Sequence, residues 1–291
     1  HDLQDSAELV QMQFDGHQYG IPYRRDRYVL LYNCELFDRA GIPYPKERLT
    51  WEQVHELAQQ MQSSLSEGEY AMMSLPMDIQ WLATGKNGSY DNAESMRQII
   101  GWVQQMQQER CMPQYSTCIA QDIQQQCFEL GQYGMYIGGT WNISTFQENN
   151  PALNFGAFQI PCEDGQVPFV STSSCGLGVS SKTENEAAAL AFANYFASQE
   201  GQEKWLGTLG SISCVASIVS DNPVVNDVQN CYTVQATSYY DILGFEAGTG
   251  DSPCNVWEED QCKIFTGAKS VQEFVDSLQA LCLTKEEMLS K

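Results

Sequence analysis

Two stretches decide the fold of this chain, RYVLLY (residues 27–32) and TWEQVHELAQQM (residues 50–61). The first is a short apolar run that ends at an asparagine, which predicts a β-strand. In the second, Thr50 and Gln53 have the spacing of a capping box. The apolar residues after them recur at helical spacing, which predicts a helix with one buried face; these residues are Val54, Leu57, Ala58 and Met61.

The same two patterns alternate along the rest of the chain. Helices are predicted over 95–106, over 183–196 with a Thr183/Glu186 box, and over 270–282 with a Ser270/Glu273 box. Short runs bounded by Gly, Pro or Asn predict strands at 134–138, 155–160 and 176–180. In the helix over 95–106 the inward residues are Met96, Ile99, Ile100, Val103 and Met106. Alternating strands and helices favour an α/β fold with sheets covered on both faces.

The composition limits the class of partner. The chain has 291 residues, 43% of them hydrophobic, which is enough for one large domain or two ordinary ones. With 37 acidic and 15 basic side chains the formal net charge is −22, so nucleic acid and anionic membrane surfaces are repelled. No apolar run is long enough to cross a bilayer. The first residues, HDLQDSAELV, have neither the basic nor the apolar region of a signal peptide.

The sequence lacks the residue spacings that the common metal-binding and enzyme motifs require. The 11 cysteines are irregularly spaced without a Cys-x-x-Cys pair, which argues against a zinc site and a full disulfide framework. Several of them read as thiols in core or surface positions. The three histidines, His1, His17 and His55, lack metal-binding spacing, and no nucleophile elbow or phosphate loop is present. We therefore expect no catalytic residue, metal or cofactor.

Carboxylates are abundant, so a glycosidase pair is not excluded by counting. The acidic run at Glu258, Glu259 and Asp260 is better interpreted as the solvated start of a helix.

Three tryptophans, Trp81, Trp141 and Trp257, lie beside Gly, Pro, Asn or Thr rather than within an apolar helical stripe. Loops carry ligand-binding residues more often than stripes do. A sugar ring has an apolar face and a rim of hydroxyls, and it suits a flat indole with polar neighbours. The alternative for each of them is plain packing on a core.

The order of segments resembles the extracellular solute-binding proteins of ABC importers, in the family 1 group of maltose- and oligosaccharide-binding proteins. The resemblance starts at FDGHQYGIPYRRDRYVLLYNCELFDRAGIPYP (residues 14–45) and continues through the helix at 50–61. It then covers GQYGMYIGGTWNIS, NPALNFGAFQIP, GLGVSSKTENEAAALAFANYFASQEGQEKW and SVQEFVDSLQAL, in that order.

This resemblance implies a periplasmic-binding-protein-like type II fold, with two α/β lobes joined by a hinge. Residues 1–23 and 173–240 would form the first lobe, which lacks the family's N-terminal βα units, so that the chain is N-terminally shortened. Residues 24–172 and 241–291 would form the second lobe. The chain would cross between the lobes near 23–27, 169–174 and 245–253.

The resemblance also implies a ligand site in the cleft between the lobes. Asp26 matches a position that accepts hydrogen bonds from sugar hydroxyls; the alternative is a salt bridge to Arg24, Arg25 or Arg27. Trp141 matches a position on which a pyranose stacks, and Gly138 and Gly139 would let the backbone approach the ligand. Further candidates are Trp81, which alternatively caps its own lobe, a late cleft aromatic at Trp257, and the polar contacts Tyr23, Asn142 and Ser174.

The expected function is that of the substrate-binding component of an ABC transporter, which captures a sugar or oligosaccharide and delivers it to permease subunits in the membrane. We expect a monomer that is extracellular or on the cell surface, held by a lipid on an N-terminal segment outside this sequence. Two alternatives stay open, a secreted glycan-active hydrolase and a receptor for a peptide or polyamine.

Overall fold

The computed structural model describes residues 9–10, 12–74, 93–115, 124–162, 174–209, 212–215, 217–229, 260 and 262–280. Within these ranges the strands form three sheets. The smallest is the hairpin of β1 (Gln13–Phe14) and β2 (His17–Gln18). An antiparallel sheet has the order β8 (Ser174–Leu177), β3 (Ile21–Arg25), β9 (Ile212–Ser213). The largest has the order β5 (Tyr70–Ser74), β6 (Tyr133–Gly139), β4 (Tyr28–Asn33), β7 (Phe155–Gln159).

The four-stranded sheet holds the main core. Its strand β4 pairs antiparallel with β6 and β7, and β5 pairs parallel with β6. Val29, Leu30 and Leu31 of β4 are fully buried, as expected for a strand with both faces covered. The helices around this sheet are α2 (Cys34–Ala40), α3 (Trp51–Gln62), α5 (Ala93–Gln108), α7 (Gln124–Glu129), α8 (Trp141–Asn149), α11 (Pro223–Gln229) and α13 (Val271–Gln279).

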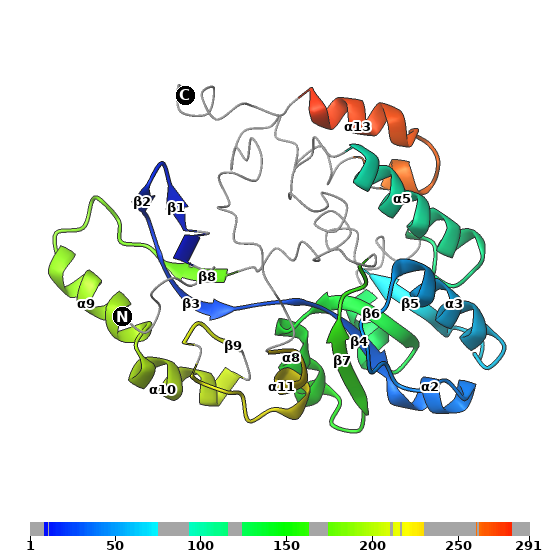
Figure 1. The fold of residues 1–291 in the computed structure, drawn as a ribbon, viewed down its shortest axis with the longest axis horizontal. Coiled ribbons are helices and arrows are strands. Elements are labelled where there is room, and N and C mark those ends of the chain that lie inside the picture. The colour runs from blue at the N-terminus through cyan, green and yellow to red at the C-terminus, as the bar shows by residue number, and fades with distance from the viewer. Residues whose placement is uncertain are drawn as a thin grey trace.

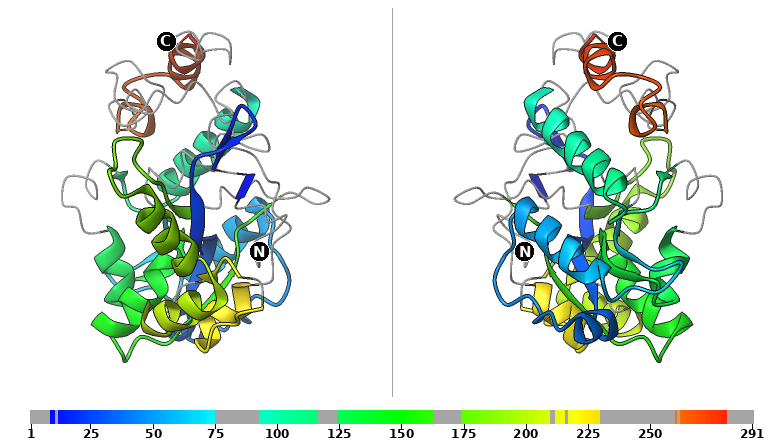
Figure 2. Two further views of the ribbon diagram at one scale, coloured as in Figure 1. Left: turned by 90° about the vertical axis from the view of Figure 1, so that its left-hand side faces the viewer. Right: turned by 90° about the vertical axis from the view of Figure 1, so that its right-hand side faces the viewer.

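Two of these helices come from late in the chain. Helix α11 packs against β7 and buries Val225 and Val228 in the main core. Helix α13 packs against α5, and Arg97 of α5 donates to Oε1 of Gln272 at 2.8 Å. Both views of Figure 2 show α13, in red, at the end of the molecule toward which α5, in teal, extends. Segments distant in sequence therefore complete the same core.

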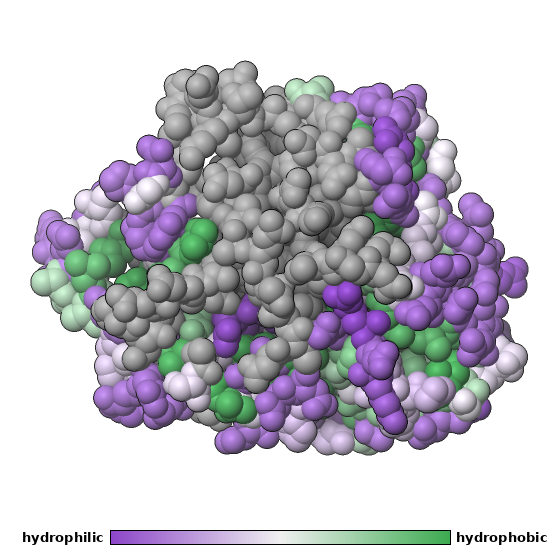
Figure 3. Space-filling view, viewed as in Figure 1, coloured by the Kyte–Doolittle hydropathy of each residue, from purple (hydrophilic) through white to green (hydrophobic). Residues whose placement is uncertain are grey.

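The three-stranded sheet has a smaller core and carries α9 (Glu186–Phe196) and α10 (Gln199–Leu209). Ala197, Cys214 and Val215 form this second cluster. Figure 1 shows β3 running from the side of α9 and α10 toward β4. Strand β4 is an inner strand of the larger sheet and the first of its strands in the chain. Helix α9 also exposes large apolar side chains, and hydrophobic surface gathers at the corresponding edge of Figure 3; they are Leu190, Phe192 and Tyr195.

The chain passes from one sheet to the other over two residues. Strand β3 ends at Arg25 and β4 begins at Tyr28, so Asp26 and Arg27 lie between the sheets. We call these two residues the crossing. Both are buried, which is unusual for charged residues outside a strand or helix.

Most of the predicted helices are confirmed in detail. At Thr50 both bonds of the capping box form, because Gln53 N–H donates to Thr50 Oγ1 and Thr50 N–H donates to Gln53 Oε1. The Ser270/Glu273 box forms in the same way. All five residues expected to point inward from α5 are buried.

The predicted Thr183/Glu186 box is wrong. Helix α9 begins at Glu186 and has Asn185 at its N-cap without a side-chain cap bond. Thr183 Oγ1 instead accepts the N–H of Asn185 at 3.2 Å, a local turn that competes with the cap.

The strands predicted at 27–32, 134–138 and 155–160 are confirmed as β4, β6 and β7. The strand predicted at 176–180 is displaced toward the N-terminus, because β8 ends at Leu177. Strand β5 was not predicted.

The expectation of a solvated acidic run is wrong at Asp260, while Glu258 and Glu259 lie outside the described residues. Asp260 is buried and accepts hydrogen bonds from the ammonium groups of Lys263 at 2.6 Å and Lys269 at 2.5 Å. These bonds hold the pKa of Asp260 below its usual range. In the part of the chain that the structure covers, no helix has the length and apolar character needed to cross a membrane.

The capping box of α3 generates a stability prediction. Thr50→Ala removes the hydroxyl that accepts the N–H of Gln53, and we expect a loss of about 1 kcal/mol in the free energy of unfolding, measured by urea denaturation. Gln60→Ala, an exposed site on the same helix, is the control and should change it by less than about 0.5 kcal/mol. Equal losses in both variants would contradict the role of the box.

Candidate functional site

The crossing is fastened to the end of β6 by Thr140, the residue between β6 and α8. The N–H of Arg27 donates to Thr140 Oγ1 at 3.1 Å, and the N–H of Thr140 donates to the carbonyl oxygen of Arg27 at 2.9 Å. Thr140 and Arg27 are both buried. A buried backbone without such partners would cost free energy, so these two bonds make the buried crossing possible.

Asp26 is the carboxylate of the crossing, and its side chain is 1% exposed. Its Oδ2 accepts from Nε of Arg24 at 2.7 Å, and its Oδ1 lies 3.4 Å from Thr140 Oγ1. Burial raises the pKa of Asp26 above its usual value, although the ion pair with Arg24 acts in the opposite direction. The salt bridge to Arg24, which the sequence left as the alternative for Asp26, is therefore formed. Both carboxylate oxygens of Asp26 face protein groups.

Trp141 is the first residue of α8 and follows Thr140 directly. Its half-buried indole meets Tyr28 of β4 edge to face, with ring centroids 5.1 Å apart and an interplanar angle of 84°. The indole also lies over Gly139, where an added Cβ would come within 2.1 Å of a ring carbon. Trp141 is thus placed within one residue of the group that fastens the crossing.

The expected role of the two glycines needs correction. The space above Gly139 is filled by the indole, and that above Gly138 by the ring of Tyr136 and Oδ1 of Asn142. Asn142 is buried, and its Oδ1 accepts the N–H of Gly139 at 2.9 Å. In this structure both glycines make room for the protein's own side chains rather than for a ligand.

Tyr23 also reaches the crossing. Its ring packs edge-on against Phe196 and Trp205, with centroids 5.1 and 5.0 Å away. Burial raises the pKa of the Tyr23 hydroxyl, and Cys175 raises it further. Arg24 and Asp26 lie close enough to act on the same hydroxyl.

The other candidates are less informative. Ser174 lies in β8, where its backbone is opposite Arg25 of β3. Trp81 and Trp257 lie outside the described residues. The structure therefore brings Tyr23, Asp26, Trp141 and Asn142 to one region and leaves three candidates without a side-chain position.

Sequence reasoning missed two residues of this region. Thr140 is not among the residues predicted for the site, although its position between a glycine pair and a tryptophan indicates the end of a strand. Arg24 was considered only as a partner of Asp26, because the sequence does not show which of the two side chains is exposed.

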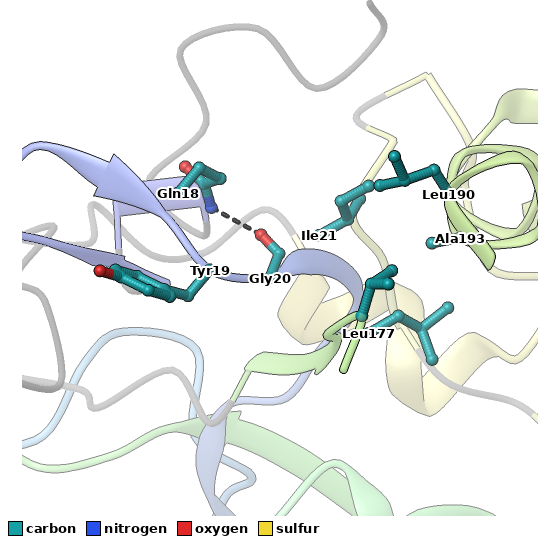
Figure 4. A pocket seen from close by; sticks show the side chains of 8 residues that line it. Gln18, Tyr19, Gly20, Ile21, Leu177, Leu190 and Ala193 are labelled. Carbon is teal, nitrogen blue, oxygen red and sulfur yellow. Dashed lines mark hydrogen bonds between the residues drawn. The ribbon is translucent and has the colours of Figure 1, made fainter. Parts of the chain in front are cut away.

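A cavity of about 200 Å³ lies elsewhere, between β3, β8 and α9 (Figure 4). Its lining is mostly apolar, and the Gln18 amide donates to the carbonyl oxygen of Gly20 at 2.6 Å. The lining residues are Gln18, Tyr19, Gly20, Ile21, Leu177, Val179, Leu190 and Ala193. It offers few groups for a polyhydroxylated solute.

The described thiols do not form disulfides. All seven described cysteines are free, and five of them are buried, which agrees with their reading as small core residues. Within the described ranges, no three or more His, Cys, Asp or Glu side chains are grouped to hold a metal ion.

Residues 2–231 match the family model described as bacterial extracellular solute-binding protein. The match spans most of the chain, and the chain belongs to this family. No curated protein matches it.

Solved structures agree with this assignment at the level of the fold. A sugar transporter protein from Rhizobium etli in an open conformation is 20% identical with a TM-score of 0.71, over 94% of this chain and 74% of that one. A family 1 extracellular solute-binding protein from Bifidobacterium longum subsp. infantis is 21% identical with a TM-score of 0.68, over 96% and 77%.

UgpB from Mycobacterium tuberculosis in complex with glycerophosphocholine is 15% identical, with a TM-score of 0.73 over 94% of this chain and 72% of that one. At these identities the likeness concerns the fold alone. The expected type II periplasmic-binding-protein fold is thereby confirmed.

The fastening of the crossing generates the second prediction. Thr140→Val keeps the side-chain shape but leaves the buried N–H of Arg27 without its acceptor, and we expect a loss of about 1–3 kcal/mol in the free energy of unfolding. Thr140→Ser keeps the hydroxyl and should lose less than half as much. Both are measured by urea denaturation, and a Val variant as stable as wild type would show that the hydroxyl is dispensable.

Proposed function

We propose that this chain is the substrate-binding component of an ABC importer, which captures a sugar or oligosaccharide and delivers it to a membrane permease. Membership of the extracellular solute-binding family supports the receptor role. The observation that carries the proposal is the indole of Trp141, which lies half-buried beside the crossing between the two sheets. Proteins of similar fold that bind saccharides, among them a cyclic α-maltosyl-1,6-maltose binding protein from Arthrobacter globiformis, support a sugar as the solute.

The proposed mechanism is hinge closure. The lobes expected from the resemblance, residues 1–23 with 173–240 and 24–172 with 241–291, are proposed to move about the crossing, except that Arg24 and Arg25 belong to the smaller sheet and α11 to the main core. Two further crossovers are proposed near 169–174 and 245–253, where residues 169–173 and 245–253 lie outside the described residues. The crossing suits a hinge because two residues join two separate sheets. A solute that contacts both lobes binds the closed arrangement better and shifts the population toward it.

Sugar binding at this site would use stacking together with polar bonds. An indole that is already fixed against Gly139 and Tyr28 loses little conformational freedom when a pyranose covers its open side. Tyr23, Asn142, Ser174, Trp81 and Trp257 are proposed as further parts of the cleft. Asp26, which is 1% exposed, is proposed to support it from behind through its ion pair with Arg24. A micromolar dissociation constant corresponds to about −8 kcal/mol, which one or two stacked rings and several hydrogen bonds can supply.

The alternatives fit the crossing less well. A hydrolase needs two carboxyl groups that face the glycosidic bond, whereas Asp26 is buried in an ion pair. A polyamine would meet the part-exposed guanidinium of Arg24, and like charges repel. We therefore propose a receptor without enzymatic activity. From its family we further propose that it is monomeric, outside the cell and anchored by a lipid.

Trp141→Ala tests the proposal. We first expect a thermal-shift screen of mono- and oligosaccharides, amino acids and polyamines to raise the melting temperature most with a saccharide. With that saccharide, Trp141→Ala should weaken binding by about 2 kcal/mol or more in calorimetry, while Trp141→Phe loses less.

Two matched variants complete this test. Phe192→Ala removes an exposed aromatic ring from α9 and should leave the affinity unchanged. Tyr19→Ala alters the cavity beside α9. Loss of binding in Tyr19→Ala with full binding in Trp141→Ala would move the solute to that cavity and contradict the proposed site.

A further inference from the structure

We infer that Arg24 binds an anionic group of the solute, and that Asp26 is the positioning residue which holds Arg24 for this purpose. The solute is then a saccharide that carries a negative charge, either the carboxylate of a sugar acid or a phosphate ester. This inference rests on the proposed sugar-binding function and names the class of sugar.

The first argument is accessibility. The side chain of Asp26 is 1% exposed and both of its oxygens face protein groups, so a solute does not reach this carboxylate in the described conformation. The side chain of Arg24 is 27% exposed. Of the two partners in this ion pair, the guanidinium is the one that a solute can touch.

The second argument is the unused edge of the guanidinium. Arg24 bonds to Asp26 through Nε alone, and no residue in the described part of the chain accepts from its Nη1 or Nη2. A guanidinium has five N–H donors and no acceptor. The free N–H groups are therefore available to acceptor oxygens, of water or of a solute, and a carboxylate or phosphate can accept two parallel bonds from them.

The third argument is the local charge. Residues 24–27 contain three arginines and one aspartate, and the Asp26 carboxylate is paired with Arg24. Arg27 lies against Asp26, with Nη1 donating to the Asp26 carbonyl oxygen at 3.2 Å. Arg25 lies next in the chain and donates from Nε to the carbonyl oxygen of Ser213 at 2.6 Å. The part-exposed guanidinium of Arg24 attracts an anionic solute that contacts it, and a neutral sugar lacks this attraction.

The ion pair also explains why a costly buried aspartate is present. A long arginine side chain loses rotamer entropy when it binds, and a bond at Nε fixes the plane of the guanidinium beforehand. Thr140 holds the other oxygen of Asp26, so the orientation of Arg24 is set by the same residue that fastens the crossing. The indole of Trp141, adjacent in the chain, would cover the ring of the same solute.

The test compares three probes by calorimetry: trigalacturonate, glucose 6-phosphate and neutral maltotriose. We expect wild type to bind one of the anionic probes at least tenfold more tightly than maltotriose, with an affinity that falls as salt is added. Whether the carboxylate or the phosphate probe binds distinguishes the two sources of charge. Arg24→Gln should remove at least this tenfold preference and change maltotriose binding by less than threefold.

Two controls keep the result interpretable. Arg39→Gln alters an ion-paired, partly exposed arginine on α2, bonded to Glu69, and should leave all affinities unchanged. Arg24→Gln leaves a buried carboxylate without its partner, so the double variant Arg24→Gln/Asp26→Asn, which removes both charges, is measured alongside it. Both variants should show the same loss of preference if Arg24 is the contact.

The outcomes separate the two proposals. Maltotriose bound as tightly as both anionic probes, or an undiminished preference in both Arg24 variants, would overturn the role of Arg24 and leave the sugar receptor standing. Failure of every saccharide in the thermal-shift screen, with stabilisation by an amino acid or a polyamine, would overturn the sugar-receptor proposal and this inference with it.

Discussion

The two hydrogen bonds between Thr140 and the backbone of Arg27 are the constraint on which the site depends. A chain that leaves one sheet and enters another within two residues cannot pair its peptide groups in either ladder. Here one threonine supplies an acceptor through its hydroxyl and a donor through its backbone, so the crossing can be buried. The next residue in the chain is Trp141, and the threonine hydroxyl also faces Asp26. The contacts of Thr140 that stabilise the crossing therefore also position the residues of the site.

Burial and charge act against each other at the crossing. Taking Asp26 out of water raises its pKa, and the ion pair with Arg24 offsets only part of that cost. Such a pair is weak evidence for stability. It does fix the orientation of a long side chain, which is what a binding site requires.

Much of the fold could be predicted from local patterns, because the hydrogen bonds and buried faces behind those patterns involve residues close together in the sequence. The reciprocal box at Thr50 and the apolar run of β4 needed no distant partner to be recognised. The Thr183 box failed because a threonine can close a local turn instead of capping a helix. Strand β5, YAMMS, was missed because Ala and Met favour helices, and its pairing with β6 is decided by tertiary contacts.

The site was less predictable than the fold. Trp141 and Asp26 could be named from a family resemblance; in the structure Trp141 follows Thr140 in the chain, and the Thr140 hydroxyl faces Asp26. What each side chain touches could not be named, since it depends on contacts between residues more than 100 positions apart, such as Arg27 with Thr140. That Arg24 is partly exposed while Asp26 is buried is likewise decided by tertiary packing. The spacing of residues in the sequence does not predict it.

The most direct measurement of the central claim, that the solute meets the protein at the crossing, is hydrogen exchange of the backbone amides with and without the most stabilising saccharide. The account predicts that saturating solute slows exchange at residues 26–28 and 139–142, where two lobes close on the crossing. Slowing confined to residues 18–21, 177–179 and 190–193, around the cavity beside α9, would contradict it.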